Sequence, residues 1–393
     1  MHASDRYRSA GLLKAVWAAG LWALIAGPVL AAPASAHKAL VAHAATHAAL
    51  HGSSHAAIHA AKVPDKAADP VPAASAATPA AVPLVHEVPT PADLSPELAK
   101  KYMTAASRFY QVGDVTLHVR DEGKGPVIVL LHDAMSSLQA WDPWMNELVG
   151  SYRVIRVDEP GNGLSGSYPA GDYTPERVLA TLTRLIEGLG LQHITLVGNG
   201  MGGFYAARFA AEHPDQVERL ALLAPAAYPA RLPPMLIYYL HNNDGEDMPA
   251  PVPMNLYAPS FRQSYGEPSR IQPGVMERYQ ELTQLPGNRR SNLQLLRVLR
   301  DFGKNPDDYA SKQPAFVKQL KMPVLVMWGQ RDRMISSDQA QLWKRDVPQA
   351  QVVLYPDAGH PLSEEIPEQS LKDFLAFMRG DGPDTTVSAS SRP

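Results

Sequence analysis

One glycine-rich stretch, from Ile194 to Ala210, has a residue spacing with a direct chemical meaning. It reads ITLVGNGMGGFYAARFA, and Gly198, Gly200 and Gly203 satisfy the G-x-G-x-x-G pattern of a dinucleotide-binding turn. The same stretch also fits a sharp turn between a strand and a helix, on which an enzyme can mount a nucleophile. The middle residue of that turn is Gly200, which has no side chain. The stretch therefore predicts either a cofactor loop or a nucleophile turn without its nucleophile.

The surroundings of this stretch argue against a bound nucleotide. A dinucleotide-binding turn follows the first strand of its unit, and an Asp or Glu comes about 20 residues later, at the end of the next strand. Here several predicted strands come first, and the next one, VERLALLAP at 217–225, ends without a carboxylate. We therefore expect no nucleotide at this turn, and we expect the protein to use no cofactor.

A second chemical pattern lies in a run rich in Ala, Pro and His. Histidines recur there at every fourth position, and residues four apart share one face of a helix, so neighbouring pairs could chelate Zn²⁺, Cu²⁺ or Ni²⁺. The five histidines are His43, His47, His51, His55 and His59. The alternative is a low-complexity tract of repeated HAA units that binds no metal. Prolines over its second half oppose regular structure, so residues 37–97 are predicted to be a disordered linker.

The first 36 residues have the layout of a secretory signal peptide. Arg6, Arg8 and Lys14 precede an uncharged apolar run, and the small residues ASA at 34–36 match the A-x-A cleavage rule. An uncleaved membrane anchor is the alternative, because the run approaches the ~20 residues that span a bilayer. In both cases we expect an exported protein, periplasmic or secreted. Contact with a membrane is expected only if this segment stays uncleaved.

Composition narrows the classes of function. The chain has 393 residues and a formal net charge of −3, so its electrostatics do not favour nucleic acid as a partner. It has no cysteine, which excludes disulfides, thiolate metal sites and a cysteine nucleophile. A small-molecule substrate or ligand is therefore the expected partner.

Strand and helix signals alternate between residues 98 and 380, the predicted catalytic domain. Short apolar runs such as PVIVLLH, HITLVG and PVLVMWG are typical of strands buried on both faces, and amphipathic helical stretches separate them. This alternation predicts an α/β fold, with a mostly parallel sheet flanked by helices on both faces. Residues 381–393 are predicted to be a disordered tail.

An insertion at about 226–312 interrupts this alternation. Its first part is rich in Pro, Tyr and Met, and it ends in two helical stretches. An insertion of this size between two core strands is usually a lid over the strand ends, where it would line an apolar pocket. The expected lining residues are Tyr238, Tyr239, Met235 and Met254, which could equally pack inside the lid. We therefore expect the substrate or ligand to be small and apolar.

Five segments form a recognisable combination: LLHDAMSSLQAWDPWMNEL, VIRVDEPGNGLSG, LVGNGMGG, LVMWGQRDRMI and YPDAGHPLSEEIPE. In their order and spacing they resemble the α/β-hydrolase superfamily. The resemblance implies an eight-stranded sheet with a helical lid, a Ser–Asp–His triad and hydrolase activity of the esterase type. It assigns the acid of the triad to Asp332 and its histidine to His360. It assigns the two oxyanion-binding amides to Ala134 and Met201.

Two positions depart from the family pattern. The G-x-S-x-G elbow reads GNGMG at 198–202, so Gly200 leaves the nucleophile position vacant. The His-Gly of the oxyanion turn reads His132-Asp133. Asp133 either places a carboxylate at the rim of the substrate pocket or faces solvent.

Three functions are compatible with these residues. The first is an esterase-type hydrolase that has lost acyl-enzyme catalysis and is now a pseudoenzyme. The second is a serine-independent enzyme in which the His360/Asp332 pair acts as a general base. The third is a non-catalytic protein that binds a ligand or partner through the former substrate pocket.

Overall fold

The computed structural model describes residues 85–228, 234–243, 251–302 and 314–381. The predicted signal peptide, the histidine tract and the tail beyond residue 381 lie outside this part of the chain, as does the side chain of Met235. Among the described helices, none is long and apolar enough to span a bilayer.

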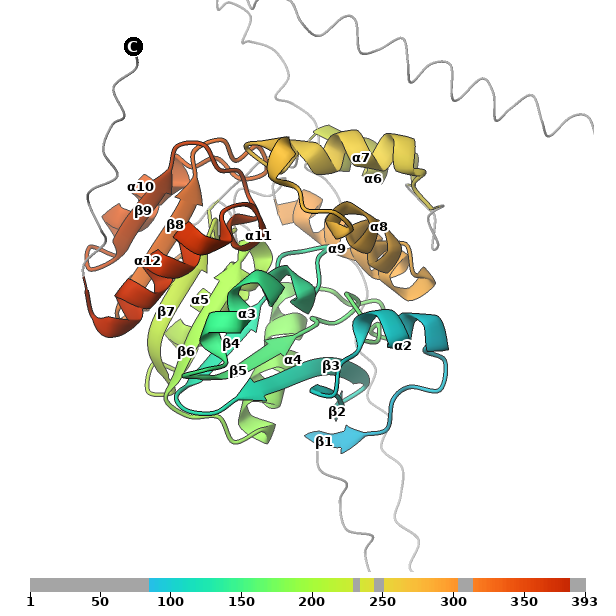
Figure 1. The fold of residues 1–393 in the computed structure, drawn as a ribbon, viewed down its shortest axis with the longest axis horizontal. Coiled ribbons are helices and arrows are strands. Elements are labelled where there is room, and N and C mark those ends of the chain that lie inside the picture. The colour runs from blue at the N-terminus through green and yellow to red at the C-terminus, as the bar shows by residue number, and fades with distance from the viewer. Residues whose placement is uncertain (1–84, 229–233, 244–250, 303–313, 382–393) are drawn as a thin grey trace, which may run out of the picture. The chain divides into compact units, whose positions relative to one another are not determined.

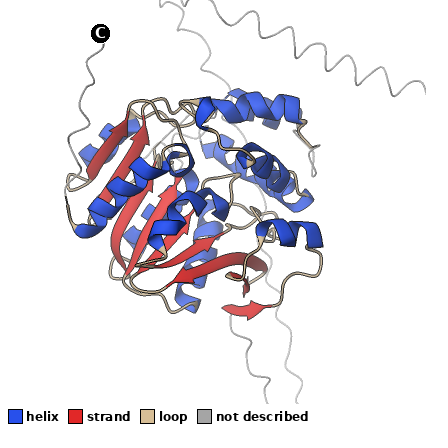
Figure 2. Ribbon diagram, in the orientation of Figure 1, coloured by secondary structure: helices blue, strands red, loops and turns tan. Residues whose placement is uncertain are grey.

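Nine strands form one sheet in the order β1-β2-β3-β5-β4-β6-β7-β8-β9, shown in Figures 1 and 2. The strands β4 to β9 pair in parallel, whereas β1, β2 and β3 add to the β5 side in antiparallel pairs. The parallel strands are β4 (Val127–Leu131), β5 (Arg153–Val157), β6 (Ile194–Asn199), β7 (Val217–Leu223), β8 (Val324–Gly329) and β9 (Gln351–Tyr355). This arrangement confirms the predicted α/β fold with a mostly parallel sheet, with nine strands instead of eight.

The ninth strand lies in the segment that was predicted to be a linker. Strand β1 (Val85–Val88) pairs with β2 (Ser107–Val112), which pairs in turn with β3 (Val115–Gly123). Helix α2 (Pro96–Tyr102) follows β1, and the Ser95 hydroxyl accepts a hydrogen bond from the backbone of Leu98. Pro96 is compatible with this helix because the first turn needs no backbone donor. The folded domain therefore begins by residue 85, and not at residue 98.

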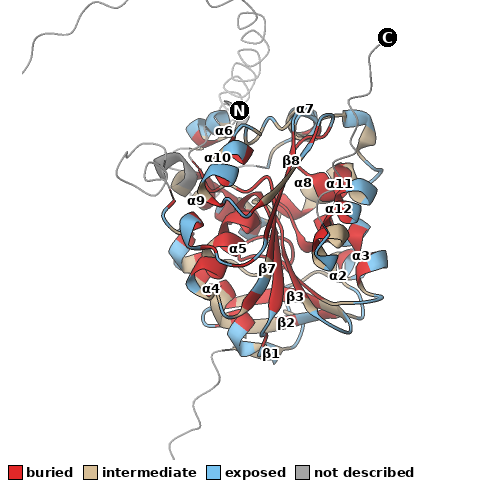
Figure 3. Cartoon of the chain, turned by 90° about the vertical axis from the view of Figure 1, so that its left-hand side faces the viewer, coloured by how far each residue is buried: buried red, intermediate tan, exposed pale blue. Residues whose placement is uncertain are grey.

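Helices cover both faces of the sheet, which Figure 3 shows edge-on. Helices α4 (Pro175–Gly188), α5 (Gly200–Glu212) and α10 (Gln339–Asp346) lie on one face. Helices α3 (Asp142–Leu148), α11 (Leu362–Glu365) and α12 (Pro367–Arg379) lie on the other. Each layer closes its own apolar core, with Trp343 buried in the first and Trp144 in the second. The strands are thus buried on both faces, as their continuous apolar runs predict.

The described part of the insertion between β7 and β8 contains four α-helices: α6 (Pro234–Asn242), α7 (Met254–Gln263), α8 (Val275–Thr283) and α9 (Pro286–Phe302). In Figure 1 they form a separate yellow and orange group beside the two layers. Helix α8 is tied to the core, because the Tyr279 hydroxyl donates to Glu364 at 2.6 Å and Arg278 forms an ion pair with the same carboxylate at 2.5 Å.

One buried carboxylate joins the insertion to the loop that precedes α11. Glu365 is fully buried and accepts backbone hydrogen bonds from Gly266 (3.1 Å), Glu267 (2.8 Å) and Gly359 (2.7 Å). In addition, the backbone of His360 donates to the carbonyl of Ser264 at 2.8 Å. The position of the His360 loop therefore depends on the insertion.

We expect Glu365→Gln to destabilise the domain by about 1–3 kcal/mol, because an amide group cannot replace a carboxylate as the acceptor of three buried N–H donors. Urea unfolding followed by circular dichroism measures the change. Glu368→Gln, on the exposed side of the first turn of α12, is the matched control. Equal stability of the two variants would contradict this role of Glu365.

Candidate functional site

The strand register brings the ends of three neighbouring strands together. Strand β4 lies between β5 and β6, and its last residue, Leu131, pairs with Val157 on one side and Gly198 on the other. Two residues beyond these partners come Asp133 after β4, Glu159 after β5 and Gly200 after β6. The chain leaves β4 toward one edge of the sheet and later returns beside it with β6. In open α/β sheets, the carboxyl ends of strands at such a reversal form the usual ligand site.

The carboxylate of Asp133 points into this site and lies against the turn that starts α5. Its Oδ1 accepts a hydrogen bond from the backbone N–H of Met201 at 2.8 Å. Its Oδ2 lies 2.9 Å from Nε2 of His360. A Cβ atom placed on Gly200 would overlap the carboxylate of Asp133. The Asp133 side chain therefore occupies the space that a side chain on the elbow would need.

The elbow backbone has the left-handed conformation that favours glycine. Gly200 has φ of +50°, at the junction of β6 and α5. A residue with a side chain would be strained in this conformation by about 1–3 kcal/mol, whereas glycine adopts it without that cost. A second residue of the site, Met135, also has positive φ (58°) although it carries a side chain. Local strain thus persists at the turn after β4.

His360 is held between two carboxylates. Its Nδ1 lies 2.7 Å from Oδ2 of Asp332, and its Nε2 contacts Asp133. The other oxygen of Asp332 accepts backbone hydrogen bonds from Met334 (2.7 Å) and Ile335 (3.0 Å), which fixes the carboxylate. Asp332 and His360, expected as partners from the sequence, therefore lie in hydrogen-bonding contact.

The contacts between these groups shift the pKa values of His360 and Asp133. Burial alone would lower the pKa of His360, but Asp332 and Asp133 outweigh it and hold the pKa well above its usual range. Burial would likewise raise the pKa of Asp133, but His360 and the backbone N–H groups of Met201 and Ala134 bring the pKa below its ordinary value. These shifts favour the imidazolium form of His360 and the carboxylate form of Asp133.

The residues expected to bind an oxyanion and to line a pocket are distributed as follows. The amides of Met201 and Ala134 both stabilise the Asp133 carboxylate, so an anion from the chain itself occupies this position. Tyr239 packs with Leu240, Leu293 and Leu296 in an apolar cluster that includes Met135. In contrast, Tyr238 is 53% exposed and is not enclosed. Met254 is half-buried.

Glu159 is a residue of the site that sequence reasoning missed. It is only 4% exposed, and its Oε1 has no hydrogen-bond partner among the described residues. Burial raises the pKa of its carboxyl well above the ordinary value, and the negative charges of Asp133 and Asp158 raise it further. The available signal was its place in VDEPGNG, directly after a strand that is buried on both faces.

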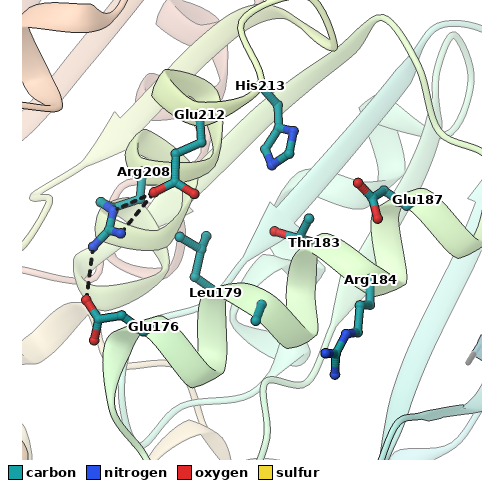
Figure 4. A pocket seen from close by; sticks show the side chains of 9 residues that line it. Glu176, Leu179, Thr183, Arg184, Glu187, Arg208, Glu212 and His213 are labelled. Atoms are coloured by element: carbon teal, nitrogen blue, oxygen red, sulfur yellow. Dashed lines mark hydrogen bonds and ion pairs between the residues drawn. The ribbon is translucent and has the colours of Figure 1, made fainter.

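A separate hollow lies on the outer surface between α4 and α5, shown in Figure 4. Its volume is about 410 Å³, and its lining includes Glu176, Thr183 and Arg184 from α4, together with Arg208, Glu212 and His213 at the end of α5. Arg208 forms ion pairs with Glu176 and Glu212 across its rim. This hollow lies toward the end of α5 opposite Gly200 and does not include the Asp133–His360 site.

Comparisons with known proteins agree with this architecture. A family model described as alpha/beta hydrolase fold matches residues 126–367. The dihydrolipoyllysine-residue acetyltransferase component of an acetoin cleaving system from Pseudomonas putida is 27% identical over 256 residues, which cover 65% of this chain and 64% of that protein. A cis-3-alkyl-4-alkyloxetan-2-one decarboxylase from Shewanella oneidensis is 27% identical over 289 residues, which cover 67% of this chain and 85% of that one.

A solved structure gives the same result for the fold. The crystal structure of a putative lipase from Acinetobacter baumannii AYE matches with a TM-score of 0.61 and 22% identity, covering 73% of this chain and 97% of that one. The family model covers more than half of the chain and includes the strand ends that carry Asp133, Gly200 and Asp332, as well as His360. This chain belongs to the alpha/beta hydrolase family.

Proposed function

We propose that this protein is a serine-independent hydrolase in which the carboxylate of Asp133 takes the place of the missing elbow nucleophile. The observation that carries this proposal is the overlap between the Asp133 carboxylate and any side chain on Gly200. Gly200 has no group that can attack a substrate, so no acyl-enzyme forms at the elbow. Asp133 reaches the same position from the neighbouring strand, beside His360 and the oxyanion amides.

The position of the two Asp133 oxygens favours attack at a saturated carbon. An acyl substrate would need the amides of Met201 and Ala134 for its developing oxyanion, but these amides already bind Asp133. Displacement of a leaving group X from a saturated carbon needs no oxyanion site. In this step Oδ2 forms a bond to the carbon, the C–X bond breaks, and X leaves with the electron pair. The product is an ester of Asp133 whose carbonyl oxygen, Oδ1, stays on the amide of Met201.

Hydrolysis of this ester uses the same groups in new roles. Esterification removes the charge of Asp133, so the pKa of His360 falls and the ring releases its proton, which passes to solvent when X leaves as a halide ion. Neutral His360 then accepts a proton from water as the water attacks Cγ, and the amide of Met201 holds the oxyanion on Oδ1. Collapse of the intermediate releases the alcohol, which takes its proton from His360. The restored carboxyl returns its proton to His360, so the net reaction converts R–X and water into R–OH and HX.

The apolar wall beside Asp133 supports an apolar R group. Met135, two residues after Asp133, packs with Leu240, Leu293 and Leu296 from α6 and α9 of the insertion. The side chain of Asp133 keeps 21% of its surface exposed, so the carboxylate is reachable from outside. In this proposal the insertion acts as a lid that lines the substrate site.

A single turnover in ¹⁸O-labelled water tests this mechanism with 1-bromobutane as substrate. We expect the first butanol released to contain ¹⁶O, because its oxygen comes from Asp133, and the peptide that contains Asp133 to gain ¹⁸O. We expect Asp133→Asn to lower kcat by about 10⁴-fold or more, since the amide is a poor nucleophile. Gas chromatography and peptide mass spectrometry measure both results.

Two outcomes would overturn the proposal. Incorporation of ¹⁸O into the first alcohol released would assign the attack to water, with the His360/Asp332 pair as general base. A wild type that turns over neither alkyl halides nor epoxides, and whose Asp133 gains no label, would leave a non-catalytic ligand-binding protein. In that case the charge-neutralised Asp133–His360 pair has only a structural role.

A further inference from the structure

We infer that Glu159 is a further catalytic residue, the proton donor to the leaving atom, and that the natural substrate therefore has an oxygen leaving group, such as an epoxide. This inference rests on the proposed function, because it assigns a partner to the attack by Asp133. The geometric basis is the register of three parallel strands, which places Glu159 and Gly200 on either side of Asp133.

The backbones of Glu159 and Asp133 are joined through one histidine ring. The N–H of Glu159 donates to Nε2 of His132 at 3.0 Å, and Nδ1 of the same ring donates to the carbonyl oxygen of Asp133 at 2.6 Å. Burial lowers the pKa of His132, so this ring is neutral, in agreement with one nitrogen accepting and the other donating. The turn that carries Glu159 is therefore fixed relative to the turn that carries Asp133.

The loop that carries Glu159 is also fixed by hydrogen bonds to the preceding residue, Asp158. Asp158 accepts backbone hydrogen bonds from Leu138 (2.7 Å) and Leu164 (2.9 Å), and it contacts Nδ1 of His118 at 2.8 Å. Asp158 thus has its hydrogen-bonding capacity used in the structure. Glu159, one residue later and equally buried, has an oxygen without a partner in the described part of the chain.

Asp133 and Glu159 have different environments, which favour different protonation states of their carboxyl groups. Asp133 has a cation and backbone N–H donors and is an anion, whereas Glu159 is buried beside Asp133 and Asp158 with no cation in contact within the described ranges. Tyr205 of α5 is near enough to Glu159 for the two groups to interact, and burial raises the pKa of this tyrosine as well. A pair of carboxyls separated in this way divides into a nucleophile or base and an acid.

The resulting step balances without any further reactant. As Oδ2 of Asp133 attacks a carbon of the epoxide, the C–O bond breaks and the ring oxygen takes the proton of Glu159. The product is a hydroxyalkyl ester of Asp133 and a Glu159 carboxylate. The proton that His360 releases after esterification then restores Glu159. A bromide ion needs no proton when it leaves, so an alkyl bromide does not need the acid.

This difference between leaving groups supplies the test. We expect Glu159→Gln to lower kcat with styrene oxide by about 10²–10⁴-fold, a much larger loss than with 1-bromobutane, because bromide leaves without a proton. Gln has nearly the same shape as protonated Glu, so we also expect the same thermal unfolding temperature. Glu159→Asp keeps the acid on a shorter side chain and should recover part of the epoxide activity.

The outcomes separate this inference from the proposed function. Equal losses with both substrates would assign a structural role to Glu159 and overturn the inference, while dependence on Asp133 would still hold. Unchanged epoxide turnover in Glu159→Gln would also overturn it. A wild-type protein that turns over neither substrate would overturn both the proposed function and this inference.

Discussion

A chain carrying both Asp133→Gly and Gly200→Ser is expected to hydrolyse p-nitrophenyl acetate, whereas Gly200→Ser alone is expected to remain inactive. In the single variant, the new side chain would overlap the Asp133 carboxylate, and Asp133 would still occupy the amide of Met201. In the double variant, no carboxylate at position 133 fills the site. The introduced serine then has His360 as its base, Asp332 behind His360, and free oxyanion amides.

We expect the double variant to exceed Gly200→Ser by at least about 10²–10³-fold in kcat, the effect of recovering an oxyanion donor. Only the double variant should be labelled at the introduced serine by a fluorophosphonate probe. In both variants Ser at position 200 adds about 1–3 kcal/mol of backbone strain, because the position is left-handed. In the single variant the new side chain also overlaps the Asp133 carboxylate, so this variant should unfold at a lower temperature. Asp133→Gly alone, which has no nucleophile, is the control.

Comparable esterase activity in Gly200→Ser alone would contradict this account. It would mean that Asp133 moves out of the site at little cost and does not exclude the serine. The substitutions at 133 and 200 would then be independent, and a double-mutant cycle of stability would show additive effects.

The second large effect that we expect is a loss of folding stability when the cation of the site, His360, is removed. His360→Ala leaves Asp133 and Asp332 close together without a positive charge, and breaking a buried ion pair in this way costs about 3–5 kcal/mol. Urea unfolding at pH 6 measures the loss. His193→Ala, which removes a largely exposed histidine, is the control and should change stability little.

The pH dependence of this loss has a definite sign. In the wild type, the lowered pKa of Asp133 gives stability that is present above its ordinary pKa of about 3.8 and is lost only as the pH falls through the lower folded value. The raised pKa of His360 gives stability that is fully present below its ordinary pKa of about 6.5 and is lost as the pH rises through the folded value. These two contributions are therefore nearly constant between about pH 6 and pH 4.5.

The stability of the His360→Ala variant, in contrast, should change with pH over that interval. Without His360, burial raises the pKa of Asp133, so the folded state binds a proton that the unfolded state does not. The stability of His360→Ala relative to wild type should therefore increase as the pH falls from 6 to 4.5. A constant difference between the two proteins would show that Asp133 is not held as an anion by His360.

Much of the fold could be predicted from sequence because the signals are local. Apolar runs of strand length, separated by amphipathic helices, predict a parallel sheet with helices on both faces, and the insertion is visible as a break in that alternation. The edge strand β1 was missed because four residues among prolines have no periodicity of their own. Only pairing with β2 makes Val85–Val88 a strand.

The candidate site also has one part that local motifs predict and one part that they do not. The motifs around Asp332, His360 and Gly200 identify an acid, a histidine and an elbow without a side chain, because each motif is contiguous in sequence. The direction of the Asp133 side chain was left open between the pocket rim and solvent, because a turn residue can face either way. Its contact with His360 spans 227 positions of the chain and has no local signal.

The sequence by itself determined that residue 200 cannot attack a substrate, since glycine has no functional group. Only the tertiary structure decided what occupies that place. The register of β5, β4 and β6 sets Glu159, Asp133 and Gly200 side by side, and the absence of a side chain on Gly200 leaves room for the Asp133 carboxylate against His360 and the amide of Met201. Register depends on the packing of whole strands against both helical layers, so no single segment of the sequence contains it.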